Sequence, residues 1–280
     1  MKSFQELQEG IDPKYFEDLK EHYPIKSEEG SRTPPYVVVS SDKYVLHPVF
    51  QPYKFKHFEK ELEDRRKKGL YIPQVIAIGS QAILFEYMNG IQLGNKLDDS
   101  DVDKIARIHR LFLGNKVDAV PFYNTVEKLK NSIDILKEYL GIQTEKLLDI
   151  FGNDVLEESL FLTHGDWGYL NLLKDGEKIK IIDLELVDYR PQEYDLFRPL
   201  IRICNSENQR RIYLSNFEDV SEKKLIVAAL RFYVSKTISR HKYGFSEEAQ
   251  RANERSKKIM QVGFNCDLET VLKELENIKP

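Results

Sequence analysis

The feature that most constrains the fold is a change of hydrophobic period at Asn89–Gly90. Before it, short runs of β-branched and aromatic residues predict four strands: 36–39, 44–46, 74–78 and 82–87. One charged amphipathic segment, 54–68, predicts a helix that ends at Gly69. The first 24 residues have apolar residues at helical spacing and predict one or two short helices closed by Pro24.

After Gly90 the apolar residues recur every three to four positions, which predicts helices. One stripe comprises Val102, Ile105, Ala106, Ile108 and Leu111, and a second runs over 126–140. The change of period therefore predicts an α+β chain of two lobes. We expect a small β-rich N-terminal lobe at 1–88 and a larger helical C-terminal lobe at 89–280.

One β island interrupts the helical part, between Leu160 and Leu186. It contains an apolar strand, a polar loop and two further strands joined at Asp175–Gly176, a dipeptide typical of hairpin turns. Polar residues with apolar neighbours concentrate here, so the island is the first place to look for chemistry.

Composition excludes several function classes. The chain has 42 Lys plus Arg against 46 Asp plus Glu, a net charge of −4, which disfavours nucleic acids and membrane surfaces as partners. The N-terminus lacks the apolar region of a secretory signal, and no apolar run approaches the ~20 residues of a membrane span. We therefore expect a cytoplasmic protein.

Three polar residues of the island fit one reaction. Asp166 and Asn171 are five positions apart across the loop, and Asp183 follows an apolar strand. Phosphoryl transfer from a nucleotide needs a carboxylate that accepts the proton of the attacking hydroxyl, and oxygen ligands that hold Mg²⁺ against the phosphates. One Asp and one Asn suffice for Mg²⁺, which prefers hard oxygen ligands and keeps some waters.

The island resembles the aminoglycoside phosphotransferase and choline kinase family, a branch of the protein-kinase-like fold. The resemblance rests on the motif HGDWGYLN, from His164 to Asn171, and on IIDLE around Asp183. Weaker similarities lie in 84–90, 105–109 and 188–196. Together they extend over residues 36 to 200.

The resemblance implies a role for each matching residue. Asp166 would be the catalytic base, His164 would support its loop, and Asn171 and Asp183 would bind Mg²⁺. Glu86, Tyr87 and Met88 would offer backbone groups to the base of the nucleotide, the adenine of ATP or the guanine of GTP. Glu185 would face the acceptor, and Asp195 would be a helix N-cap that holds the loop. Trp167 is a candidate to stack on the substrate, with packing in the core as the alternative.

One position departs from the family pattern. His47 stands where the family usually has a lysine that pairs the nucleotide phosphates with a helix glutamate, for which Glu61 is the candidate and Glu59 and Glu63 compete. Histidine is shorter and largely neutral at pH 7 unless a carboxylate raises its pKa. Lysines that could substitute are Lys43, Lys54 and Lys56.

The sequence therefore predicts an ATP- and Mg²⁺-dependent kinase that phosphorylates a hydroxyl of a small molecule such as an antibiotic, choline or a sugar. A nucleotide-binding pseudokinase is the alternative, because of His47. A protein kinase is disfavoured, since DFG and APE segments are missing. Acidic residues favour a cationic acceptor, with neutral or zwitterionic ones left open: Glu185, Asp188, Glu193, Glu207, Glu218 and Asp219.

Overall fold

The computed structural model describes residues 3–25, 35–40, 42–49, 51–117, 160–262 and 266–278. Its contacts group the chain into two compact units. The first comprises 1–94 and 169–186, and the second comprises 95–168 and 187–280. This grouping differs from a division after Met88, because 169–186 contributes strands to the first unit.

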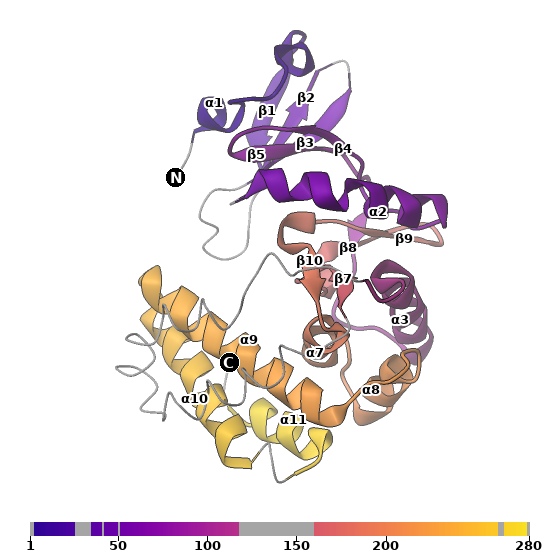
Figure 1. The fold of residues 1–280 in the computed structure, drawn as a ribbon, viewed down its shortest axis with the longest axis vertical. Coiled ribbons are helices and arrows are strands. Elements are labelled where there is room, and N and C mark those ends of the chain that lie inside the picture. The colour runs from indigo at the N-terminus through magenta and orange to yellow at the C-terminus, as the bar shows by residue number, and fades with distance from the viewer. Residues whose placement is uncertain are drawn as a thin grey trace. The chain divides into compact units, whose positions relative to one another are not determined.

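The first unit is built on a five-stranded antiparallel sheet (Figure 1). In spatial order its strands are β1 (Glu21–Pro24), β2 (Tyr36–Val39), β3 (Lys43–Pro48), β5 (Ala82–Glu86) and β4 (Val75–Ile78). Four of them were predicted. The first was expected to be helical, but Glu21–Pro24 is an edge strand on β2. All four of its residues are exposed, so it carries no apolar alternation, and an edge strand tolerates proline.

Alternate residues of this sheet pack against different neighbours. Val38, Leu46 and Leu84 form a core cluster with the short N-terminal helix α1 (Phe4–Leu7). Phe85 packs instead against helix α2 (Phe55–Lys67), with the rings of Phe55 and Phe85 5.8 Å apart. Burying such side chains stabilises the unit by about 1.5–3 kcal/mol each.

A smaller sheet completes the first unit. It consists of β6 (Ile91–Gln92), β8 (Leu172–Asp175) and β9 (Lys178–Ile181), with β8 in the centre. The predicted hairpin turn at Asp175–Gly176 joins β8 to β9, and Gly176 has a φ of +58°, which glycine adopts readily. The island is therefore divided, since its hairpin belongs to the first unit.

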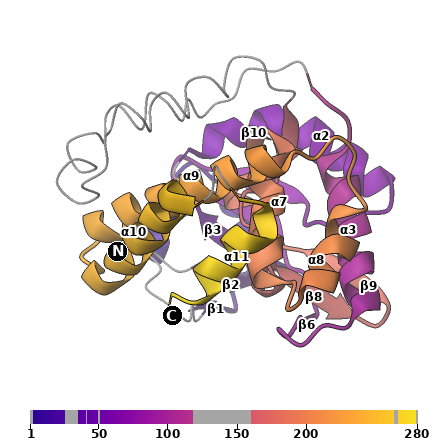
Figure 2. The ribbon, with the colours of Figure 1, turned by 90° about the horizontal axis from the view of Figure 1, so that it is seen from below.

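Helices dominate the second unit, around a two-stranded sheet of β7 (Phe161–Thr163) and β10 (Asp188–Arg190). They are α3 (Asp99–Leu113), α7 (Gln192–Arg202), α8 (Glu207–Leu214), α9 (Glu222–Lys242), α10 (Ser246–Val262) and α11 (Leu268–Glu276). In Figures 1 and 2, α9 and α10 lie side by side. The predicted α+β class, a β-rich N-terminal part and a helical C-terminal part, is confirmed; the stripe over 126–140 lies outside the described residues.

The buried face of helix α3 differs in part from the predicted apolar stripe. Val102, Ile105 and Ala106 are buried as predicted, but the stripe continues through His109 and Phe112 rather than through Ile108 and Leu111. Within the described part of the chain, no helix has the length and apolarity to cross a membrane.

Candidate active site

The loop that follows β7 is held by a carboxylate of helix α7. Asp195 accepts hydrogen bonds from the backbone amides of His164 (2.6 Å) and Gly165 (2.7 Å). The Asp166 amide in turn donates to Nδ1 of the buried His164, at 3.2 Å. Asp195 therefore holds the loop as expected, but it is not the N-cap: α7 begins at Gln192, and its N-cap is Pro191.

A buried network behind the loop keeps Asp195 ionised. His109 contacts Oδ2 of Asp195 through Nε2 (3.1 Å) and the hydroxyl of Tyr213 through Nδ1 (2.6 Å). Burial lowers the pKa of His109, against the opposing effect of Asp195, so the ring is neutral. Because an ionised carboxylate only accepts, Nε2 donates to Asp195 and Nδ1 accepts from Tyr213.

The pKa of Asp195 reflects these contacts. Burial raises it, but hydrogen bonds and the histidines His109 and His164 outweigh burial and lower the pKa to about 2. Asp195 is thus a fully buried anion whose oxygens are occupied by the loop and by His109. The loop shape is a consequence of that single buried charge.

Asp166 lies between two arginines that sequence reasoning missed. Arg198 and Arg202, both on α7, donate to its Oδ1, the latter at 2.8 Å. Asp195, Arg198 and Arg202 are spaced three and four positions apart, so they share one helix face. This spacing of a carboxylate and two arginines is the sequence signal from which the two arginines could have been predicted to lie beside the loop.

Trp167 does not face an acceptor. Its side chain is 1% exposed, and its ring stacks on His109 with the centroids 4.0 Å apart. The residue follows Asp166 directly, and the loop turns it into the core of the second unit. Of the two roles predicted for Trp167, the structure therefore has packing in the core and not contact with an acceptor.

The first unit brings Asn171 and Asp183 together. Leu172 pairs with Ile181 across the β8–β9 hairpin, and one step further the amide of Ile182 donates to the Asn171 carbonyl at 3.0 Å. Asp183 follows with a φ of +62°, a left-handed conformation that is costly for a non-glycine residue and is found mainly at functional sites. The backbone of Asn171 therefore pairs with the residue that directly precedes Asp183.

His47, on β3, contacts two carboxylates of this site. Its Nε2 lies 3.3 Å from Asp183 and its Nδ1 lies 3.9 Å from Glu185. Burial opposes the charged ring, but Asp183 and then Glu185 outweigh it and raise the pKa of His47 to about 9. At neutral pH, His47 is therefore a cation, as a lysine would be.

The expected pair with Glu61 is not formed. His47 has no contact with Glu61 among the described residues, and Glu61 instead pairs with Arg65 one turn along α2, at 3.5 Å. Lys43, a possible substitute, lies over the ring of Tyr87, with its amine 3.9 Å from the centroid. His47, which stands where the family usually has a lysine, is itself a cation at this site.

The donor set fits a divalent cation. Ligand atoms of His47, Asp183 and Glu185 all lie within 4.8 Å of one another. Asp183 and Glu185, with the amide of Asn171, offer the hard oxygen atoms that Mg²⁺ prefers, whereas a protonated His47 cannot ligate a metal. The residues are thus compatible with Mg²⁺ on oxygen atoms, with His47 as a neighbouring charge.

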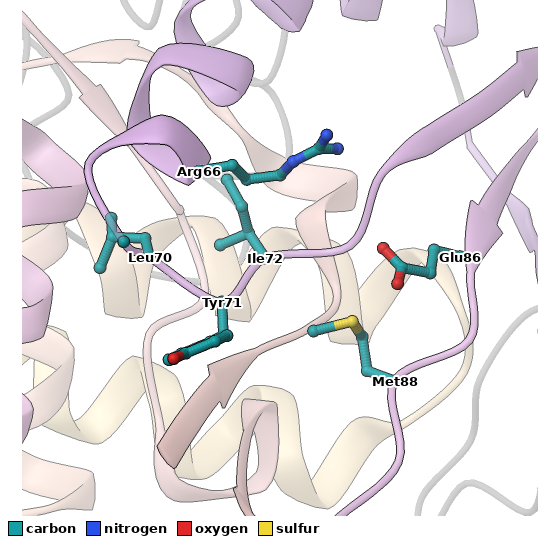
Figure 3. Close-up of a pocket in the computed structure, with 7 residues that line it drawn as sticks. Arg66, Leu70, Tyr71, Ile72, Glu86 and Met88 are labelled. Carbon is teal, nitrogen blue, oxygen red and sulfur yellow. The ribbon is translucent and has the colours of Figure 1, made fainter.

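The segment 86–88, predicted to bind the nucleotide base, borders a pocket of about 230 Å³ (Figure 3). Glu86 and Met88 line one side, and 69–72 together with Arg66 lines the rest. The Glu86 carboxylate accepts from the amide of Gln74 at 3.1 Å, and the Tyr87 amide donates to the Lys43 carbonyl at 3.3 Å. The Glu86 amide donates to the Gln74 carbonyl at 2.9 Å, whereas the Met88 amide makes no hydrogen bond within the described residues. Of the three amides predicted to bind the nucleotide base, we therefore consider that of Met88.

Four of the six acidic residues expected to attract a cationic acceptor are buried or paired with other side chains. Asp188 and Glu193 are 2% and 4% exposed. Glu207 pairs with Arg211 and Lys273, and Glu218 pairs with Arg110. These four residues therefore do not form an acidic surface at Asp166.

Comparisons with known proteins identify the fold. The sequence matches no family model, and no curated protein is significantly similar to it. Among solved structures, choline kinase LicA from Streptococcus pneumoniae superposes with a TM-score of 0.67 at 15% identity, over 89% of this chain and 96% of that chain.

Two antibiotic-modifying enzymes are similar as well. A thermostable mutant of the aminoglycoside phosphotransferase APH(4)-Ia, in complex with ADP and hygromycin B, matches with a TM-score of 0.64 at 15% identity, over 91% of this chain and 98% of that one. The GDP complex of an aminoglycoside 2′-phosphotransferase-IIIa mutant matches with a TM-score of 0.63 at 17% identity, over 88% and 93%. The resemblance of the motifs is thus confirmed in three dimensions: this chain has the protein-kinase-like fold of the choline kinases and aminoglycoside phosphotransferases.

Proposed function

We propose that this protein transfers the γ-phosphate of ATP or GTP to a hydroxyl group of a small molecule. The observation that supports the proposal is the backbone hydrogen bond between Ile182 and Asn171 at the end of the β8–β9 hairpin, with Asp183 following at positive φ. Asn171 and Asp183 stand at the positions that the motif assigns to metal ligands. Similar structures that contain ADP or GDP support a nucleotide as the donor.

Asp166 would act on the acceptor. Its carboxylate would accept a hydrogen bond from the acceptor hydroxyl and draw off the proton as the phosphoryl group is transferred. The loop that carries Asp166 is fixed through His164, Gly165 and Asp195, so the carboxylate is oriented before substrate binds. Such preorganisation supplies much of the rate enhancement in phosphoryl transfer.

Asn171 and Asp183 would hold Mg²⁺, with Glu185 as a third oxygen donor. When bound, Mg²⁺ neutralises the phosphates and the charge that develops on the transferred group. His47 would keep Asp183 in place through their 3.3 Å contact and would add a positive charge beside the phosphates. The pseudokinase alternative rested on a neutral histidine at position 47. A charged His47 removes that reason for it.

The test is phosphate transfer by the full chain and by the variant Asp166→Asn. ATP or GTP is supplied with Mg²⁺ and a panel of hydroxyl acceptors, and phosphorylated products are measured by mass spectrometry. We expect Asp166→Asn to lower kcat about 10²–10⁴-fold, because general-base contributions are of this size. The matched control is Asp64→Asn on the exposed face of α2, which should retain the wild-type rate.

Two results would contradict the proposal. An unchanged rate in Asp166→Asn would remove that residue from the reaction. Nucleotide-dependent stabilisation of the wild type, with no phosphorylated product from any acceptor, would instead favour a binding module. Melting curves of each variant confirm that the protein is folded during the assay.

A further inference from the structure

Five cationic side chains gather near Asp166 in the second unit. They lie on three helices, and we call them the basic cluster: Arg198 and Arg202 of α7, Lys236 and Arg240 of α9, and Arg255 of α10. Arg202 links the cluster to the candidate active site, because its guanidinium donates to the Asp166 carboxylate at 2.8 Å.

Electrostatic effects tie the members together. Burial lowers the pKa of the Lys236 amine, and Arg240, Arg202 and Arg255 lower it further, while Glu248 alone opposes them. Geometry places the same side chains together. Arg198 and Arg255 lie over the rings of Phe232 and Tyr233, which precede Lys236 by one turn of α9, and Arg240 follows Lys236 by one turn. Arg202 shares the Asp166 carboxylate with Arg198.

Carboxylates do not balance this charge. Asp166 is shared by Arg198 and Arg202, and Glu248 pairs with Arg240 at 2.8 Å. Arg255 donates to a backbone carbonyl, that of Ile278, and within the described residues Lys236 has no ion-pair partner. Among the residues that the structure describes, the carboxylates of Asp166 and Glu248 therefore pair with three of the five cations.

Aromatic rings hold the cations in place. The Arg198 guanidinium lies over the Phe232 ring at 4.9 Å, and that of Arg255 lies over the Tyr233 ring at 5.6 Å. The side chains of Arg198, Arg202 and Arg240 are 18%, 36% and 25% exposed, so they are restrained yet reachable from solvent. Half-buried like charges held this close are unfavourable alone, and an anion among them would relieve the repulsion.

We propose that the acceptor carries its own anionic group, a carboxylate or a phosphate, which binds among Arg202, Lys236 and Arg255 and thereby presents a hydroxyl to Asp166. This inference rests on the proposed function, since it names the acceptor of that reaction. Guanidinium groups bind such oxyanions in bidentate fashion, and Lys236 adds a point charge. A cationic acceptor such as choline would be repelled by the same residues.

The anion that the cluster binds has two conceivable sources, the acceptor and the γ-phosphate of the nucleotide. The variant Lys236→Gln distinguishes them, because it removes one charge with little change of length and leaves Asp166 and its arginines intact. We expect the KM for an anionic acceptor to rise about 10–100-fold, as loss of a charged hydrogen bond predicts, with the nucleotide KM unchanged. A rise in the nucleotide KM alone would overturn the assignment to the acceptor.

Matched acceptors supply the second arm. We would compare 4-hydroxybutyrate with 1,4-butanediol and choline, and glucose 6-phosphate with glucose, in phosphate-transfer assays. The inference predicts that kcat/KM favours the anionic member of each set, and that Lys236→Gln reduces this preference. Equal or better use of the neutral or cationic members would overturn the inference and leave the proposed kinase activity standing.

If none of these acceptors is phosphorylated, a direct measurement of anion binding tests the inference. Calorimetric titration of the full chain with inorganic phosphate and with 4-hydroxybutyrate should detect binding that Lys236→Gln weakens and that Lys242→Gln, an exposed position on the same helix, does not. Without ligand, Lys236→Gln should also raise Tm, since it removes repulsion; a purely structural lysine would lower Tm on removal. Absence of anion binding, or equal binding by the wild type and Lys236→Gln, would overturn the inference.

Discussion

The two units place their candidate carboxylates in opposite electrostatic settings. In the first unit, Asp183 and Glu185 both contact the cation of His47. In the second, Asp166 alone is shared by two arginines. Histidine can lose its charge within an accessible pH range and arginine cannot, so only in the first setting is the cation neutralised as the pH rises.

The two units also differ in what holds their candidate site residues in place. The Asp166 loop depends on one fully buried anion, Asp195, which contacts His109, His164 and Gly165 inside the second unit. The site of the first unit is held by a hairpin register and by the strained backbone of Asp183. A buried side-chain charge therefore holds the Asp166 loop, whereas the first unit combines backbone pairing with the His47–Asp183 contact.

The largest effect is expected from Asp195→Ala. Removing this carboxylate leaves the amides of His164 and Gly165 and the ring of His109 without their buried acceptor. We expect the free energy of unfolding to fall by about 3–5 kcal/mol, as for other broken buried charge networks. Urea denaturation measures the loss, with Asp64→Ala on exposed α2 as the control; equal midpoints for the two variants would show that Asp195 does not hold the loop.

Next in size is the pH dependence of the His47 contact. The pKa of His47 is about 9 in the folded chain and near 6.5 when unfolded, so the folded state binds the proton more tightly. The contribution to stability is fully present below pH 6.5 and is lost as the pH rises to 9; its size is of the order of 3 kcal/mol.

Urea midpoints measured from pH 6 to 9.5 test this expectation. His47→Gln should remove most of the pH-dependent loss, while His47→Lys should keep the stability to higher pH because lysine stays charged. Wild-type and His47→Gln curves that run parallel over this range would show that His47 does not carry the charge. Arg202→Lys, on the other unit, should leave the slope unchanged.

The smallest effect is expected from Glu61→Gln. In the described residues Glu61 pairs with Arg65 and has no contact with His47, so removing its charge should change kcat less than about twofold and stability by at most ~1 kcal/mol. Steady-state rates and melting curves provide the measurement. A large loss of kcat would mean that Glu61 reaches the nucleotide site after all and that the family pair forms during the reaction.

The sequence predicted the parts of the molecule that rest on local patterns. Strands β2 to β5, helix α2 and the Asp175–Gly176 turn follow from period and turn chemistry, and the motif HGDWGYLN with IIDLE led to the fold. Side-chain orientation was less accessible. For Trp167, contact with the substrate and packing in the core were both open, because its burial depends on stacking with His109, 58 positions earlier in the chain.

Charge pairing was hardest to predict. Arg198 and Arg202 carried no sequence motif, and their approach to Asp166 depends on how α7 packs against the loop. The raised pKa of His47 likewise depends on the approach of Asp183, 136 positions away. Counting acidic residues favoured a cationic acceptor because a count cannot show which carboxylates are buried or paired.

The divided composition of the first unit has a consequence for synthesis of the protein. Residues 95–168 separate its two parts, so β6 has no neighbour until β8 has left the ribosome, and any fragment that stops before Asp183 lacks a predicted metal ligand. At roughly 5–20 residues per second, the interval between completing Gly94 and completing Leu186 is about 5–20 s. During that time the N-terminal sheet must persist as a nascent intermediate, and the unit becomes whole only when two distant stretches of one polypeptide are joined.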